Sequence, residues 1–230
     1  MNIKKLAGIS LACSAIALSA APAQAGLVLS LTDGSSTVTI ADGGGGDSNT
    51  NANVVTWLGA LGSWSINVST ALSFAPNGEA GIDLNSVDYS TGAGNLWISM
   101  WTNAADFTSP PAGPSSMRSD IGGTIGGGTG SSVSVAGFIN NGTPGALPAG
   151  GTWTPVIGQG PFAPTAFSGS THAPVTIGGG FDLGQVVAIA HAAAGATSFD
   201  SSIAVPEPSI LVLLGLGLLG FGFARRRRAS

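Results

Sequence analysis

Short runs in which apolar and polar residues alternate fill the middle of the chain. The clearest run is 63–70, where Trp64, Ile66 and Val68 fall on one face and small polar residues on the other. A period of two is typical of a half-buried β-strand. The same alternation recurs at Leu27/Leu29/Leu31, Val38/Ile40, Leu96/Ile98/Met100, Val133/Val135 and Val187/Ile189. These runs predict an all-β fold.

Clusters of turn-forming residues separate the runs. They are Pro76-Asn77-Gly78, Pro110-Pro111-Ala112-Gly113 and Asn140-Asn141-Gly142. Many short strands joined by such turns predict a single antiparallel β-sandwich or jelly-roll-like domain. Proline and glycine are so frequent over 109–130 and 140–180 that we expect long surface loops or edge segments there.

Two segments near the end of this region need a choice between structures. Leu183–Ala194 fits either a strand or a helix, because Val186 to Ile189 favours a strand and the alanines after it favour a helix. We predict a strand. Ser198–Ala204 is predicted to form a final strand or a short spacer.

The last 26 residues, 205–230, have a different pattern, VPEPSILVLLGLGLLGFGFARRRRAS. Residues 209–224 carry no charge and, at about 1.5 Å per residue, predict a transmembrane helix roughly 24 Å long. Four arginines follow at once and resist translocation, which places the C-terminus in the cytoplasm. They are Arg225, Arg226, Arg227 and Arg228.

This tail resembles a known sorting signal. Val205-Pro206-Glu207-Pro208, the short apolar helix and the terminal arginines closely resemble the PEP-CTERM sorting signal of Gram-negative bacteria that make extracellular polysaccharide. The resemblance implies that an exosortase, a membrane-embedded transpeptidase-like enzyme with a cysteine nucleophile, recognises the tail and removes the helix. It covers about a tenth of the chain and concerns where the protein goes rather than what it does there.

The other end of the chain predicts export. Residues 1–25 contain two lysines, an apolar stretch over 6–21 and a small-x-small site at Ala23 and Ala25, which together predict a signal peptide cleaved after Ala25. Cys13, the one cysteine of the chain, lies inside it. A lipoprotein site at Cys13 is the less favoured alternative, because serine stands three positions before it. The remaining domain, 26–204, therefore has no disulfide and no thiolate metal site.

The charge of this domain excludes several functions. Residues 26–204 hold one cation, Arg118, against ten carboxylates, a formal charge of −9. Nucleic-acid binding depends on lysine and arginine neutralising phosphates, so nucleic acid is not an expected partner. The glycine-rich segment 122–130 lacks the Lys-Ser/Thr of a phosphate-binding loop, and we predict a flexible loop there.

The two histidines, His172 and His191, are the candidates for catalysis. A serine hydrolase also needs a nucleophile, and the chain has no Gly-x-Ser-x-Gly motif. We therefore predict no catalytic residue, with His172 in a solvated loop and His191 on a strand.

The segment 47–51, DSNTN, spaces oxygen side chains as calcium loops do. With Asp47 as position 1, however, Ala52 stands where an EF-hand has glycine and Leu58 where it has glutamate. A polar loop whose side chains cap its own turns is favoured over a weak calcium site. No metal site and no cofactor are predicted.

The five tryptophans all lie in 26–204, at positions 57, 64, 97, 101 and 153. Strand geometry puts Trp97 and Trp101 on one face, opposite Leu96, Ile98 and Met100. Core packing is the favoured role of these two rings. The alternative is an exposed aromatic platform that stacks on sugar rings.

The sequence thus predicts three parts: a signal peptide 1–25, a β-rich extracellular domain 26–204 and a sorting signal 205–230. Segments 81–87 and 92–98 loosely resemble the all-β ectodomains found ahead of this tail. We expect export through the inner membrane, transient anchoring there, exosortase processing, and a structural or adhesive role at the cell surface or in the exopolysaccharide matrix. The alternatives are a carbohydrate-binding module that uses Trp97 and Trp101 on extracellular polysaccharide, or a secreted hydrolase.

Overall fold

The computed structural model describes residues 26–74, 79–102, 107, 112–141, 154–163 and 165–206. Several predicted features lie outside these residues: the signal peptide with Ala23 and Ala25, Trp153, Glu207 and Pro208, the transmembrane helix 209–224, and Arg225–Arg228. Within the described part of the chain, no helix has the length and apolar character needed to cross a membrane.

The described residues form twelve β-strands. They are β1 (Val28–Thr32), β2 (Thr37–Ala41), β3 (Val54–Leu61), β4 (Trp64–Phe74), β5 (Ala80–Ser90), β6 (Gly94–Trp101), β7 (Gly113–Ile125), β8 (Ser132–Asn140), β9 (Thr154–Phe162), β10 (Thr165–Ile177), β11 (Asp182–His191) and β12 (Gly195–Val205).

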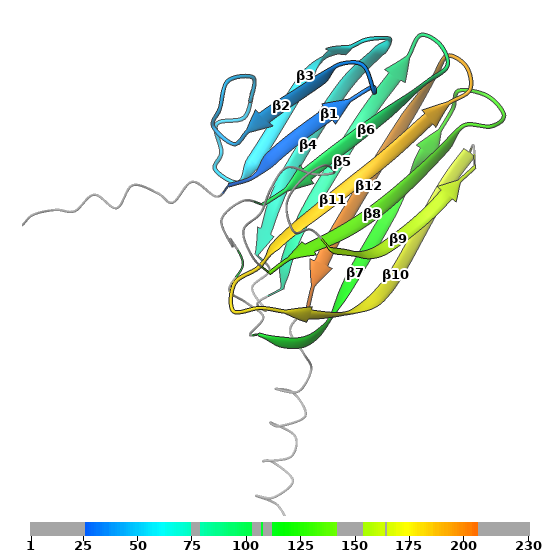
Figure 1. Cartoon of the computed structure of the whole chain (residues 1–230). Coiled ribbons are helices and arrows are strands. Elements are labelled where there is room, and N and C mark those ends of the chain that lie inside the picture. The colour runs from blue at the N-terminus through cyan, green and yellow to red at the C-terminus, as the bar shows by residue number, and fades with distance from the viewer. Residues whose placement is uncertain are drawn as a thin grey trace, which may run out of the picture.

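The strands make two six-stranded sheets that stack face to face (Figure 1). Sheet A has the order β2-β1-β6-β11-β8-β9, and sheet B has the order β10-β7-β12-β5-β4-β3. Neighbouring strands pair antiparallel throughout both sheets. The predicted all-β antiparallel sandwich is confirmed.

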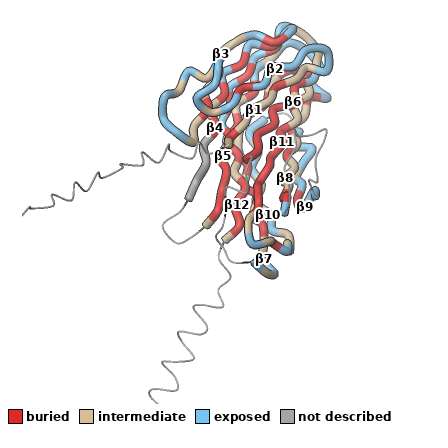
Figure 2. The backbone as a smooth tube through the Cα atoms, turned by 60° about the vertical axis from the view of Figure 1, so that its left-hand side comes forward, coloured by how far each residue is buried: buried red, intermediate tan, exposed pale blue. Residues whose placement is uncertain are grey.

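The core lies between the sheets and follows the predicted alternation. On β4, Trp64, Ile66 and Val68 are buried while Ser65 and Asn67 are exposed. The other five predicted runs supply inward side chains in the same way, and the buried residues line the centre of both layers (Figure 2). Burial of this apolar surface is the main stabilising term of a domain without cross-links.

The two ambiguous segments are both strands. Most of 183–194 belongs to β11, which lies in the middle of sheet A between β6 and β8. Residues 198–204 belong to β12, which lies in the middle of sheet B. A chain that runs between two paired neighbours satisfies its backbone groups on both sides, and this outweighs the helix propensity of the alanines.

The proline- and glycine-rich segments contain more strand than predicted. Within 140–180, β9 and β10 are edge strands of sheets A and B, as the prediction of edge segments allowed. The rings of Phe162 and Phe167 stack at 5.0 Å between centroids and join these two edges.

The prediction of a loop or edge over 109–130 was wrong for most of its length. β7 pairs with β10 on one side and β12 on the other, and it includes Gly122 and Gly123 of the predicted flexible loop. The backbone of β12 explains the glycine at 123, since a Cβ there would collide with the Ser198 carbonyl oxygen. Glycine at this position permits close backbone approach rather than flexibility.

Candidate functional site

The last strand of the fold runs into the predicted sorting motif. Val205, the final residue of β12, is fully buried and pairs with Ala80 of β5. Pro206 follows, and its carbonyl oxygen accepts a hydrogen bond of 3.2 Å from the Ser115 hydroxyl of β7. Proline has no N–H to continue a ladder, so the pairing of β12 ends here. The first two residues of the Val-Pro-Glu-Pro motif are therefore part of the folded domain.

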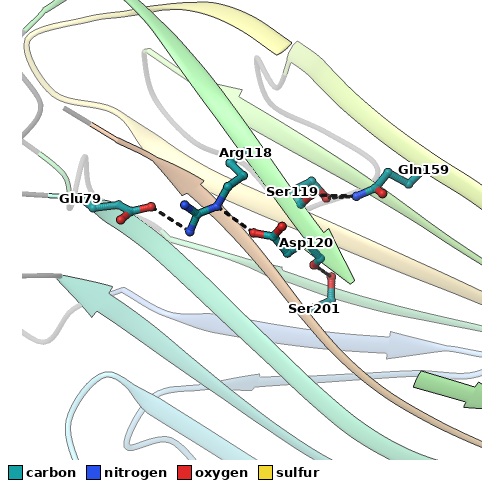
Figure 3. Close-up of polar contacts among 6 residues, drawn as sticks. All are labelled: Glu79, Arg118, Ser119, Asp120, Gln159 and Ser201. Carbon is teal, nitrogen blue, oxygen red and sulfur yellow. Dashed lines mark hydrogen bonds and ion pairs between the residues drawn. The ribbon is translucent and has the colours of Figure 1, made fainter. Parts of the chain in front are cut away.

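An ion pair crosses the end of the same strand (Figure 3). Arg118 on β7 reaches Glu79, just before β5, at 3.1 Å and also contacts Asp120 through Nε at 2.8 Å. Because β12 lies between β7 and β5, with Ala204 opposite Arg118, the pair joins the two neighbours of β12. Arg118, the one lysine or arginine of residues 26–204, therefore lies beside the end of β12 and bridges the two strands next to it.

Trp97 and Trp101 lie on the same face of β6, as predicted, and this face is the outer one of sheet A. Leu96, Ile98 and Met100 of the same strand point into the core and are fully buried. Trp101 is only 5% exposed, whereas Trp97 is partly buried and keeps accessible ring surface. The glycan platform at these rings stays a prediction.

Two other tryptophans belong to the core. Trp64 on β4 is 1% exposed, and Trp57 on β3 is partly buried and packs against the core. Both rings contribute to the packing between the sheets.

The outer face of sheet B carries a shallow hollow over β7 and β12. Asp83, Asp120, Ile121, Gly122, Gly169, Asp200 and Ser202 line it. Burial first, and then the charge and hydrogen bond of Asp200, raise the pKa of Asp83 to about 6. Gly122 contributes no side chain to this hollow.

His191 lies inside the sandwich rather than in a site open to solvent. It is 4% exposed, and its Nδ1 is 2.6 Å from the Ser90 hydroxyl while Nε2 is 2.7 Å from the Thr197 hydroxyl. The Trp64 ring packs beside it at 4.7 Å between centroids. Burial lowers the pKa of His191, which favours the neutral imidazole. The predicted strand position of His191 is confirmed.

His172 was predicted in a loop, and that prediction was wrong. It lies in the middle of β10, opposite Arg118, and is exposed. The proline and glycine residues around it suggested a loop, but an edge strand tolerates proline because one side of its backbone faces solvent. The two histidines therefore stand on different sheets, one solvated and one enclosed.

Polar side chains inside the sandwich are the feature that the sequence did not indicate. Asp88 is fully buried; Ser86 donates a 2.7 Å hydrogen bond to its Oδ1, and Oδ2 has no hydrogen-bond partner among the described residues. Burial raises the pKa of Asp88 to about 7 against the effect of Ser86. Gln185 of sheet A donates to the Ser201 hydroxyl of sheet B at 2.7 Å.

A second link between the sheets lies at the β9 edge. Gln159 donates from Nε2 to the Ser119 carbonyl oxygen and hydroxyl of β7, both at 2.9 Å (Figure 3). Like Gln185, it joins the two layers by an amide to hydroxyl contact.

The loop at Asp47 caps its own backbone. Asp47 accepts hydrogen bonds from the N–H groups of Gly43, Asn49 and Thr56, at 2.9 to 3.0 Å. Asn49 accepts in turn from the Asn51 N–H at 3.0 Å. These carboxylate oxygens are occupied by backbone donors, as the favoured interpretation of the loop predicted. Among the described residues, no group of three or more His, Cys, Asp or Glu side chains is arranged to hold a metal ion.

Comparison with protein families gives one match, and it lies where β12 leaves the sheet. The model described as the PEP-CTERM protein-sorting motif covers residues 204–228. The chain carries a PEP-CTERM sorting motif. This motif implies processing by an exosortase, and its match begins inside the last strand of the sandwich.

Comparisons of the whole chain add little to the PEP-CTERM assignment. No curated protein matches it significantly. Solved structures with some likeness include the CBM22-1 xylan-binding domain of Xyn10C from Paenibacillus barcinonensis (9% identity, 70% of this chain and 91% of that one, TM-score 0.31). A second is the mannan-recognising module TmCBM27 (10%, 68% and 90%, TM-score 0.29). A third is a carbohydrate-binding module of the β-sandwich superfamily (15%, 79% and 72%, TM-score 0.24). Likeness this low carries no argument about what this chain binds.

Proposed function

We propose that this PEP-CTERM protein is exported, processed by an exosortase and delivered to the cell surface or the exopolysaccharide matrix, where it has a structural or adhesive, non-catalytic role. The observation that carries the proposal is the direct continuity between a folded, all-β domain and the sorting motif at residues 204–228. Residues 26–204 contain no cysteine, so no disulfide can stabilise this domain outside the cell. Its stability comes instead from the burial of apolar side chains between the two sheets.

The environment of the histidines supports a non-catalytic role. The Ser90–His191 pair resembles the nucleophile and base of a hydrolase in its 2.6 Å spacing. Ser90 is fully buried and His191 nearly so, and a nucleophile must reach the scissile carbonyl of a substrate. His172 is exposed, and the described residues place no serine–histidine hydrogen bond there.

Processing is tested with an alanine triple variant of Pro206, Glu207 and Pro208. In cells that contain the exosortase, the wild type should reach the surface without its helix, and the triple variant should remain in the membrane fraction at precursor length. Wild type in cells without exosortase is the matched control and should behave like the variant. Delivery of the triple variant at the wild-type rate would contradict the proposal and leave an ordinary C-terminal anchor.

A carbohydrate-binding role is the second candidate, and the accessible ring of Trp97 on the outer face of sheet A favours it. Aromatic rings can stack on the apolar faces of sugars, and the partly exposed ring of Trp97 could contact one sugar of a polymer. Pull-down of the purified domain on extracellular polysaccharide tests it. Binding lost in Trp97→Ala and kept in Leu58→Ala, which removes a 73% exposed side chain on the other sheet, would support this function. Equal binding by both variants would exclude Trp97.

A further inference from the structure

The overlap between the PEP-CTERM motif and β12 determines how much of the motif is accessible. The match begins at Ala204, yet Ala204 and Val205 are 6% and 0% exposed. Ala204 pairs with both Arg118 and Gly81, so β12 is bonded on both sides almost to its end. The upstream part of the motif is therefore a paired interior strand.

Three contacts hold this end in place beyond the ladder. Val205 fills a core position, the Ser115 hydroxyl holds the Pro206 carbonyl, and the Arg118–Glu79 ion pair spans the two neighbouring strands. Proteases act on segments that can leave the fold, because backbone paired within a sheet does not fit an active-site cleft. The peptide bonds up to Val205–Pro206 are consequently protected in the folded domain.

The spacing to the membrane segment is short. Two residues, Glu207 and Pro208, lie between Pro206 and Ser209, where the uncharged stretch begins, and the Cα atoms of Pro206 and Ser209 are at most about 10 Å apart when the chain is fully extended. The folded domain therefore stands directly beside the segment on which the sorting enzyme acts.

We propose that β12 holds the first residues of the sorting motif, up to Pro206, as part of the folded sandwich, so that the enzyme acts on the folded domain and cuts C-terminal to Pro206. The inference rests on the exosortase processing proposed above. The cut breaks one backbone C–N bond: the acyl carbon on the domain side passes to water or to an amine acceptor, and the proton of that nucleophile moves to the leaving amine of the helical segment. Val205 and Pro206 stay with the mature protein.

The intact mass of the mature protein, produced from the full chain in cells with exosortase, gives the first test. A C-terminus at Pro206 or beyond is expected. A C-terminus at or before Val205 would overturn the inference while leaving exosortase processing in place. A chain that is never cut would overturn both, so the two failures are distinguishable.

A pair of core variants tests whether the enzyme must first pull β12 out of the sheet. Ile203→Val removes one buried methylene beside the motif, and Ile66→Val removes the same group on β4. If cleavage needed an opened β12, Ile203→Val would raise the processing rate in pulse-chase by about 2- to 10-fold, in proportion to the opened population. We expect both variants to be processed within twofold of the wild-type rate. A several-fold increase in Ile203→Val, with or without one in Ile66→Val, would overturn the inference.

Discussion

His191 of sheet A and Ser90 of sheet B are joined by a 2.6 Å hydrogen bond across the interface between the two sheets. The other ring nitrogen of His191 bonds Thr197, so one imidazole satisfies two buried hydroxyl groups. A neutral imidazole has one donor and one acceptor nitrogen, and a hydroxyl group can either accept from the first or donate to the second. The histidine is a structural link between the layers.

The first prediction concerns this link. His191→Ala removes the ring and leaves Ser90 and Thr197 buried without it, so the free energy of unfolding should fall by about 3 to 5 kcal/mol. His172→Ala, on the exposed face of β10, is the matched control and should change stability by less than about 0.5 kcal/mol. Urea titration of the domain at pH 7.5 measures both. Similar losses in the two variants would contradict the structural role of His191.

The second prediction concerns Asp88 and pH. Burial raises the pKa of Asp88 to about 7 from 3.8, so the folded state binds a proton that the unfolded state releases between these values. The contribution of Asp88 to the free energy of unfolding is fully present below pH 3.8. It is lost as the pH rises from 3.8 through 7, by roughly 4 kcal/mol in all. Asp88→Asn should therefore be more stable than the wild type at pH 8 and nearly equal at pH 4. Thermal melts at the two values check this, and a constant difference would exclude titration of Asp88 as the cause.

The third prediction concerns close packing of backbone. A Cβ at position 123 would collide with the Ser198 carbonyl oxygen of β12, so Gly123→Ala should cost about 3 kcal/mol and lower the melting temperature by roughly 10 °C. Gly92→Ala is the control, because no atom lies within 4 Å of a Cβ built there. A Gly123→Ala domain that melts with the control would show that β7 and β12 can separate without cost.

The fourth prediction separates the two tryptophans of β6. Trp101 is 5% exposed, so Trp101→Ala should destabilise the domain by about 3 to 5 kcal/mol, while Trp97→Ala should cost clearly less because its ring is only partly buried. Thermal melts followed by circular dichroism give the comparison. Equal losses would mean that Trp97 is as much a core residue as Trp101, and the case for a sugar platform would lose its accessible ring.

The fifth prediction concerns the arginines at the end of the chain. Each would cost about 2.5 to 3.5 kcal/mol at the centre of a membrane, so Arg225–Arg228 should stop translocation. Replacing all four with glutamine should let the precursor escape from the membrane before processing. Fractionation and mass analysis of the medium would then find the uncleaved tail, and full retention of this variant would contradict the topology.

The sequence predicted those parts of the fold in which apolar and polar residues alternate cleanly. β4 is such a strand, because each of its described inward positions carries a large apolar side chain or a threonine. β7 was missed because Ser119 and Gly123 stand between its inward residues Met117, Ile121 and Ile125, which hides the period of two. The pairing of Gly123 with the backbone of β12 is a property of tertiary structure that no local pattern contains.

Of the candidate sites, the sorting motif could be predicted from the sequence and the buried polar groups could not. The sorting motif was predictable because its three features follow one another in the chain. The hydrogen bond between Ser90 and His191 joins residues that are 101 positions apart in the sequence. Nothing in the local sequence distinguishes Asp88 from the other aspartates, and its burial is visible only in the folded structure. The pairing of β5 with β12 and the stacking of β11 over them bring these polar groups together inside the sandwich.

The position of β12 between β7 and β5 sets the order of events during export. Without it, sheet B consists of two separate pieces, β10-β7 and β5-β4-β3, and neither is complete. In a chain that crosses the membrane N-terminus first, the strand that unites them arrives last, immediately ahead of the sorting tail. In the export proposed above, the sandwich can therefore close only when almost the whole of residues 26–205 has crossed the membrane. We therefore expect the fold to be completed only when the sorting motif itself becomes available, because the motif directly follows β12 in the chain.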